Sequence, residues 1–187
     1  SSYGYSLNTS PNFDKLAQDS AVFEDAISAS AWSLPTTATI MSGRYPHSHG
    51  ATKRSYQFNF NETTLAEVLK AKGYNTAGFV SHSTNKKKYG IGQGFTTYRD
   101  RLKFFEYVQT FDRFSLRSVI ISFLIIPISE PLLDISRYRT AEETNSYALK
   151  WLNENKDVNP FFMFVHYNDA HIPYTPKEEF KKRFTND

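Results

Sequence analysis

A helix signal that runs directly into a strand signal is the feature that most constrains the fold of this chain. Thr64 and Glu67 match a capping box, in which a threonine and a glutamate three positions later satisfy the first amides of a helix. Gly73 supplies the stop, and residues 74–80 follow at once as a strand candidate. The pattern therefore predicts a helix and a strand in immediate succession.

The same order returns later in the chain. Thr140 and Glu143 match a second helix cap, and the helix that they begin is expected to run through Leu152. Residues 160–165, Pro-Phe-Phe-Met-Phe-Val, then form a continuous apolar run. Such a run suits a central strand of a parallel sheet, because helices cover both faces of that strand. The alternation predicts an α/β layered fold with a mostly parallel sheet flanked by helices.

Three further elements are expected in the first quarter of the chain. A serine-proline pair at residues 10–11 predicts a short helix that reaches about Gln18. Residues 21–27 are expected to form a strand that enters a loop. Pro35 is expected to start a helix that Gly43 closes.

Composition excludes several classes of function. The 187 residues are 40% hydrophobic, which suits one globular domain or part of one. Lysine and arginine number 22 against 19 acidic residues, and a formal net charge of +3 is too balanced to indicate a nucleic-acid partner. The lack of cysteine excludes disulfides, thiolate metal sites and a cysteine nucleophile.

Other segments have plain structural interpretations. Lys86–Lys88 is expected to be a solvated loop, and Gly90, Gly92 and Gly94 are expected to be turn glycines. The apolar run at residues 119–127 is too short to cross a membrane, so it predicts a buried helix or a docking surface. No secretory signal is visible in the opening residues, which favours the cytoplasm and leaves the compartment open.

Ligands of open α/β sheets collect at the carboxyl ends of the strands. Polar residues stand at three such places, residues 28–37, 81–83 and 166–174. In the first, Ser33 precedes Pro35 by two positions, which places its hydroxyl near the free amides of a helix start, where an anion binds well. Ser33 is therefore either a nucleophile for an anionic ester or a simple helix cap.

Histidines mark two of the loops. His166, Asp169 and His171 follow the most apolar strand candidate, where a histidine could protonate a leaving group, or an aspartate and a histidine could bind a divalent metal or each other. His47 and His49 are expected to lie exposed in a loop, with metal ligation as the alternative.

Together these stretches resemble the sulfatase family of the alkaline phosphatase superfamily. The resemblance lies in the order and spacing of residues 3–17, residues 31–50 and residues 161–174. It spans nearly the whole chain. The middle stretch begins Ala-Trp-Ser-Leu-Pro-Thr and resembles the nucleophile motif of that family, and the last ends His-Ile-Pro-Tyr.

The resemblance implies a hydrolase of sulfate esters. Ser33 occupies the position of the Cys or Ser that such enzymes oxidise to formylglycine, whose hydrated aldehyde is both nucleophile and metal ligand. His171 matches the histidine near the scissile ester oxygen. A divalent cation, commonly Ca²⁺ and otherwise Mg²⁺, Mn²⁺ or Zn²⁺, would polarise the sulfate. The implied partner is a small-molecule or glycan sulfate ester.

Several positions depart from the family pattern. Thr37 stands where the family has an arginine, Ser81 where it has a lysine, and Ser83 where it has a histidine, with His82 between them. We expect Thr37, Ser81, His82 and Asp169 to form the substrate-binding set. An unmodified Ser33 would suit phosphomonoester or phosphodiester chemistry, which relatives in the superfamily perform.

The remaining expectations concern the extent of the chain. Residues 1–187 should form part of a single sulfatase-like catalytic domain, as an N-terminal or internal fragment. The family's paired acidic metal ligands are then expected upstream of Ser1, and a second acidic pair beyond Asp187. A noncatalytic binding protein that kept the fold is the alternative from another functional class.

Overall fold

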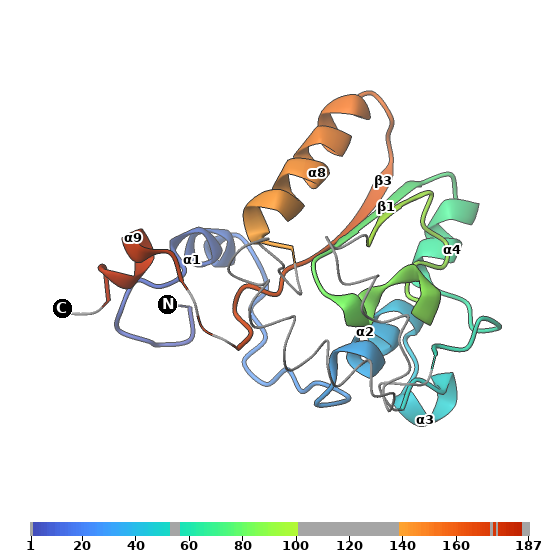
Figure 1. The fold of residues 1–187 in the computed structure, drawn as a ribbon, viewed down its shortest axis with the longest axis horizontal. Helices are drawn as coiled ribbons and strands as arrows, with labels where there is room; N and C mark the ends of the chain where they lie inside the picture. Colours follow the sequence, from blue (N-terminus) through green and yellow to red (C-terminus); the bar gives the residue numbers. More distant parts are fainter. Residues whose placement is uncertain (1, 53–56, 101–138, 173, 175, 185–187) are drawn as a thin grey trace, which may run out of the picture. The chain divides into compact units, whose positions relative to one another are not determined.

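The computed structural model describes residues 2–52, 57–100, 139–172, 174 and 176–184 (Figure 1). The chain divides into two compact units. One joins Ser1–Ser28 with Pro173–Asp187, and the other is Ala29–Ile172. The predicted apolar element at residues 119–127 lies outside the described residues.

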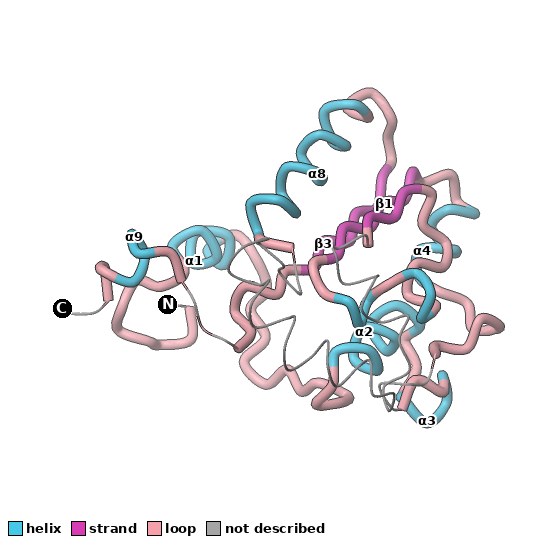
Figure 2. The backbone as a smooth tube through the Cα atoms, viewed as in Figure 1, coloured by secondary structure: helices cyan, strands magenta, loops and turns pink. Residues whose placement is uncertain are grey.

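The larger unit is built on a three-stranded parallel sheet (Figure 2). Its strands are β1 (Asn75–Val80), β2 (Thr97–Arg99) and β3 (Phe161–His166), in the order β2-β1-β3. Helix α4 (Leu65–Ala71) precedes β1, and helix α8 (Ala141–Glu154) precedes β3. The predicted helix-then-strand order and the parallel α/β class are both confirmed.

Both helix caps form as the sequence predicts. Thr64 accepts a hydrogen bond from the Glu67 amide, and the Glu67 carboxylate accepts one from the Thr64 amide at 2.8 Å. Thr140 caps α8 by accepting from the Glu143 amide. Each cap satisfies donors that a helix start otherwise leaves unpaired.

Helices cover the two faces of the sheet. Alternate strand residues point to opposite faces, so Met163 and Val165 pack under α8 while Phe162 and Phe164 face the other way. The α8 face buries Ala77, Phe79, Ala148 and Trp151. The opposite face buries Met41, Ala66 and Phe95, from α2 (Ser33–Ser42), α4 and the loop before β2.

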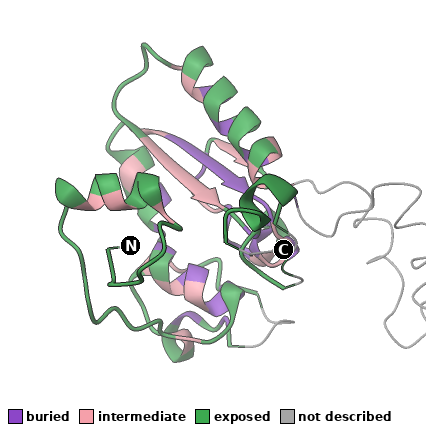
Figure 3. Ribbon diagram, turned by 90° about the vertical axis from the view of Figure 1, so that its left-hand side faces the viewer, coloured by how far each residue is buried: buried purple, intermediate pink, exposed green. Residues whose placement is uncertain are grey.

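The central strand among the described residues is β1 rather than β3. Five of the six β1 residues are buried, whereas those of β3 are partly exposed or exposed (Figure 3). The continuous apolar run correctly indicates a strand covered on both faces, but a local run carries no information about how many strands pair with it.

The smaller unit contains α1 (Pro11–Gln18) and α9 (Glu178–Lys181). Its helix α1 ends where the sequence predicts, but the strand predicted at residues 21–27 is wrong. Val22, Phe23 and Ile27 are all exposed, and this segment joins no sheet. Apolar residues predict a strand only where a neighbouring strand can take up the backbone hydrogen bonds.

Within the described ranges, no helix combines the length and apolar character that crossing a membrane requires.

Candidate active site

The loops after β1 and β3 leave the sheet side by side. Val80 and His166 are paired in the parallel register, and the Ser81 amide donates to the His166 carbonyl at 3.2 Å. Ser81 and His82 therefore start at the same edge of the sheet as the loop that carries Asp169. This edge is the carboxyl end of the strands, where the sequence pattern predicts ligand-binding residues.

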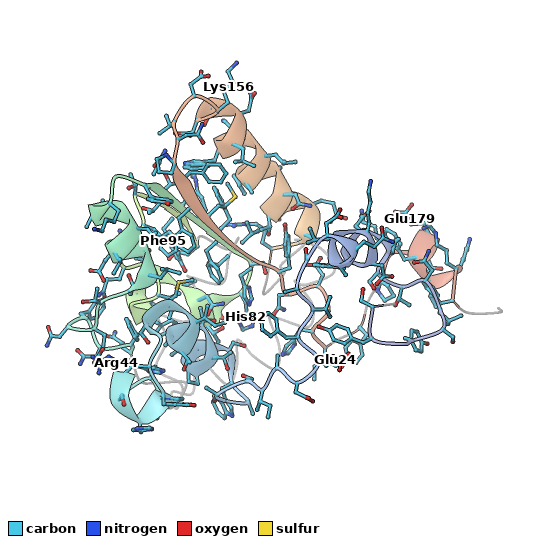
Figure 4. All side chains as sticks on the ribbon, turned by 180° about the vertical axis from the view of Figure 1, so that it is seen from behind. Glu24, Arg44, His82, Phe95, Lys156 and Glu179 are labelled. Carbon is cyan, nitrogen blue, oxygen red and sulfur yellow. The ribbon has the colours of Figure 1, made fainter. Side chains whose placement is uncertain are left out.

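Helix α2 adds a third component to this edge. It packs against the short 3-10 turn η1 (Ser83–Asn85), and Figure 4 shows His82, the residue that caps η1, beside that helix. The Ser33, His82 and His171 segments thus belong to one unit of the fold. Three stretches far apart in the sequence come together here.

Ser33 is the first residue of α2 and is exposed. The helix begins two residues earlier than predicted, because a proline in the first turn lacks only an amide that the helix would not use. Trp32 occupies the cap position and makes no side-chain cap bond. The interpretation of Ser33 as the helix cap is therefore wrong.

The start of α2 offers two free backbone donors. The Thr36 amide already donates to the Trp32 carbonyl, and Pro35 has no N–H. Among the described residues, the amides of Ser33 and Leu34 have no acceptor, and the Ser33 hydroxyl has no hydrogen-bond partner. Free amides at a helix start favour an anion by geometry and by the helix dipole.

His82 and His171 stack on one another at the edge of the sheet. Their ring centroids lie 6.1 Å apart, with 27° between the ring planes. Nδ1 of His82 accepts from the Thr84 amide at 3.3 Å, so the proton of the neutral ring resides on Nε2. Nδ1 of His171 lies 2.7 Å from the Ile172 carbonyl, which only accepts, so His171 carries its proton on Nδ1.

The two rings are consequently complementary. In their neutral forms, Nε2 of His82 is a donor and Nε2 of His171 is an acceptor. A ligand bound against these two nitrogens would meet one hydrogen-bond donor and one group that can take up and return a proton.

The other predicted site residues are held by the fold. Ser81 is fully buried, and its hydroxyl lies 3.5 Å from Nδ1 of His166, whose pKa burial lowers below the ordinary value. Thr37 lies one turn along α2 from Ser33 and is 5% exposed. Asp169 is exposed and accepts a hydrogen bond from the Ala141 amide at 2.9 Å.

The described residues do not by themselves fit a divalent cation. They contain no group of three or more histidine and carboxylate side chains that could hold a metal ion. Oxygen-preferring cations such as Ca²⁺ take six to eight ligands. The Ser33 oxygen would be one ligand only, so a cation bound there would need its other partners from elsewhere in the protein.

Two predicted surface features are buried instead. Lys86 is only 3% exposed, so the prediction of a fully solvated lysine loop is wrong at this residue. His49 lies in the short helix α3 (Pro46–His49) and is also buried. Its Nδ1 accepts from the Ala51 amide at 3.2 Å and its Nε2 lies 3.0 Å from the Thr39 hydroxyl, so both nitrogens are used by the fold and metal ligation is not its role.

The glycine prediction is confirmed, because Gly90, Gly92 and Gly94 all lie in turns. Gly90 and Gly94 have φ of +89° and +83°, values that L side chains rarely adopt. Gly92 has no such backbone, but a Cβ there would lie 2.8 Å from the Lys87 side chain.

Sequence reasoning missed Arg139 and Asn85. The Arg139 guanidinium is buried and donates to the carbonyls of Val80 at 3.2 Å and Arg99 at 3.3 Å, which joins the ends of β1 and β2. The side chain of Asn85 is fully buried, and neither atom of its amide has a hydrogen-bond partner among the described residues. No local pattern distinguishes these residues from surface ones.

The family assignment rests on a comparison that covers the whole chain. The family model described as Sulfatase matches residues 1–187. The chain belongs to the sulfatase family. Its fold agrees, because the phosphonate monoester hydrolase of Agrobacterium radiobacter superposes over 98% of this chain and 40% of its own, with a TM-score of 0.68 at 20% identity.

Other sulfatase-family proteins are similar at low identity. Iduronate 2-sulfatase of Mus musculus is 27% identical over 97% of this chain, and N-acetylglucosamine-6-O-sulfatase of Bacteroides thetaiotaomicron is 34% identical over 41% of it. A structure solved with its substrate D-glucosamine-2-N,6-O-disulfate covers 90% of this chain and 31% of its own, with a TM-score of 0.60 at 20% identity. The chain spans about a third of the mouse sulfatase, 34% of its length.

Proposed function

We propose that the protein containing this chain hydrolyses sulfate esters at Ser33, as part of a single sulfatase-like catalytic domain that includes residues 1–187. The stacked, complementary pair of His82 and His171 beside the helix of Ser33 carries the proposal. The pair offers one imidazole donor and one imidazole acceptor side by side, which suits an ester that has both a charged oxygen and a leaving oxygen.

Each group has a defined task in this proposal. The Ser33 oxygen, as the serine hydroxyl or as hydrated formylglycine, gives its proton to Nε2 of His171 and attacks the sulfur atom, and the bond from sulfur to the leaving oxygen breaks. Water then cleaves the sulfate from a serine oxygen, whereas hydrated formylglycine expels it with its second hydroxyl, and either route restores the Ser33 group. The amides of Ser33 and Leu34 and the Nε2–H of His82 donate to the oxygens on which charge grows. Nε2 of His171, once protonated, gives its proton to the leaving oxygen.

Ser81, Thr37 and Asp169 would support this centre rather than react. Ser81 precedes His82 in the sequence, and Thr37 lies one turn along α2 from Ser33. Both are buried, so a substrate could reach either of them only from within the fold. A divalent cation, Ca²⁺ by family resemblance, would act as a Lewis acid with ligands supplied outside the described residues.

Phosphodiester or phosphonate ester hydrolysis by an unmodified Ser33 is the second candidate. Thr37 and Ser81 replace the arginine and lysine of the family pattern, and the fold resembles that of a phosphonate monoester hydrolase. Phosphodiesters and phosphonate monoesters carry one negative charge, as sulfate monoesters do. The same site would therefore meet substrates of similar charge and shape.

Parallel assays on the full-length protein separate these candidates. Turnover of 4-nitrophenyl sulfate above that of bis(4-nitrophenyl) phosphate, lost on chelation and restored by Ca²⁺, supports the sulfatase proposal. A preference for the phosphodiester supports the second candidate. No turnover of either ester with any of Ca²⁺, Mg²⁺, Mn²⁺ or Zn²⁺ would instead favour a noncatalytic binding protein.

Mass spectrometry of the peptide that carries Ser33 reports its chemical state. The protein must be produced in a host that can make formylglycine. Loss of two hydrogens from the peptide shows oxidation of the serine, and an unchanged mass shows that the hydroxyl acts directly.

A further inference from the structure

The loop after β3 is tied to helix α8 by two side-chain hydrogen bonds. The Asp169 carboxylate accepts from the amide of Ala141, the first residue of α8, at 2.9 Å. The Tyr167 hydroxyl donates to the Asn145 side-chain oxygen at 2.5 Å, about one turn farther along the same helix. Two points of attachment from neighbouring residues fix the path of this loop over the start of α8.

Asp169 completes the cap of α8. Thr140 takes the amide of Glu143, while the Ala141 amide, which has no acceptor within the helix, is taken by Asp169 from across the chain. A carboxylate is also the favoured partner for the positive end of the helix dipole. The contact gives Asp169 a defined structural partner that the sequence does not reveal.

The same loop sets the position of His171. Its amide donates to the Asn168 carbonyl at 2.9 Å, which closes a turn around Asp169, and its ring is stacked on His82. Because Asp169 lies inside this turn, anchoring its carboxylate to α8 holds the turn and with it the direction of the His171 imidazole.

We propose that Asp169 is a positioning residue, which acts by anchoring the His171 loop to α8, and is not a ligand of the substrate. The catalytic meaning of the anchor rests on the proposed function of His171. The anchor itself does not, and it can be measured without turnover.

The variants Asp169→Asn and Asp169→Ala of the full-length protein test the proposal. Asparagine keeps an acceptor oxygen and caps helices about as well as aspartate, so D169N is expected to keep kcat within about threefold. Alanine removes the anchor, and D169A is expected to lower kcat by about 100-fold with little change in KM, since misplaced catalytic groups lose rate rather than binding.

Thr140→Ala is the matched control. It removes the other cap of the same helix end without touching the loop of His171. T140A is expected to lower the unfolding temperature about as much as D169A while keeping kcat, which separates positioning from a general loss of stability.

The imidazole signals of His171 in ¹H–¹⁵N NMR give the readout that needs no substrate. They are assigned by their loss in His171→Gln. They should move in D169A and stay in place in D169N and T140A. Unmoved signals in D169A would overturn the anchor, even if the wild-type protein hydrolyses no ester. A kcat/KM loss in D169N as large as in D169A, with a raised KM, would overturn the positioning role and make the carboxylate a substrate or metal ligand.

Discussion

His82 and His171 stack with their ring centroids 6.1 Å apart, although they belong to loops that follow different strands. The contact exists because β1 and β3 are neighbours in the sheet and end in register at Val80 and His166. Their Nδ1 atoms are held in opposite states, one as acceptor and one as donor. This arrangement underlies the first prediction.

Substituting either histidine should slow turnover in the full-length protein. We expect His171→Gln to lower kcat by about 10²–10⁴-fold, the usual contribution of a general acid or base. His82→Ala removes the donor to the growing charge, which glutamine would keep through its side-chain amide, and should cost about 10²–10³-fold. The double variant should lose less than the product of the two, because the groups act on one substrate.

His47→Gln is the control for this pair. His47 is exposed and stacks on Tyr45 at the start of α3, so its loss should leave kcat and KM unchanged. Equal activity of wild type and His171→Gln would remove His171 from the chemistry.

The buried His49 should make stability depend on pH. Desolvation lowers its pKa below the ordinary value, and the hydrogen bond from the Ala51 amide requires an unprotonated Nδ1. The unfolded chain therefore binds more protons below about pH 6.5, and the stabilisation present above that pH is lost as the pH falls towards the lower folded value. His166, whose pKa is lowered in the same way, adds to this slope.

Urea unfolding between about pH 7.5 and pH 5 measures the effect. His49→Asn should be less stable than wild type by about 1–3 kcal/mol at neutral pH and should show a shallower fall on acidification. His47→Asn, at an exposed position, should keep the wild-type slope. A fall in His49→Asn as steep as in wild type would contradict the assignment.

The buried amide of Asn85 should lower the free energy of unfolding. Its side chain is fully buried with both amide atoms unpaired among the described residues, which costs about 1–3 kcal/mol. Asn85→Leu replaces the amide by an apolar group of similar size and should raise the free energy of unfolding by about that amount. Asn85→Ala, which leaves a cavity, should gain less or lose stability. Chemical denaturation compares the three proteins, and a leucine variant less stable than wild type would mean that the amide has a partner such as bound water.

Some of the fold could be predicted because its signals are local. The Thr64 and Glu67 cap depends on residues three positions apart, and the apolar run at residues 160–165 depends on consecutive ones. These interactions form within a single turn or strand. Sequence spacing therefore predicts them without knowledge of the rest of the chain.

The features that sequence reasoning missed depend on tertiary contacts. Lysine and histidine are residue types that usually keep their polar groups in solvent. Lys86 and His49 are buried, in the part of the fold where η1 and α3 pack against α2. The family pattern points to Ser33 and His171 as site residues. The contact of His171 with His82 follows from strand pairing, and the contact of the Ser33 helix with η1 follows from helix packing. Residues 21–27 show the reverse case, because no strand in the described part of the chain pairs with this segment.

The most direct test of the role of Ser33 is the turnover of 4-nitrophenyl sulfate and bis(4-nitrophenyl) phosphate by full-length Ser33→Ala. Ser42→Ala is the matched control, because Ser42 ends the same helix and its hydroxyl donates to the Ala38 carbonyl of that helix. Loss of a nucleophile costs about 10⁴–10⁶ in kcat, so Ser33→Ala should fall to background on both esters while Ser42→Ala keeps its rate. Turnover by Ser33→Ala at the wild-type rate would contradict the assignment of Ser33 as the reactive residue.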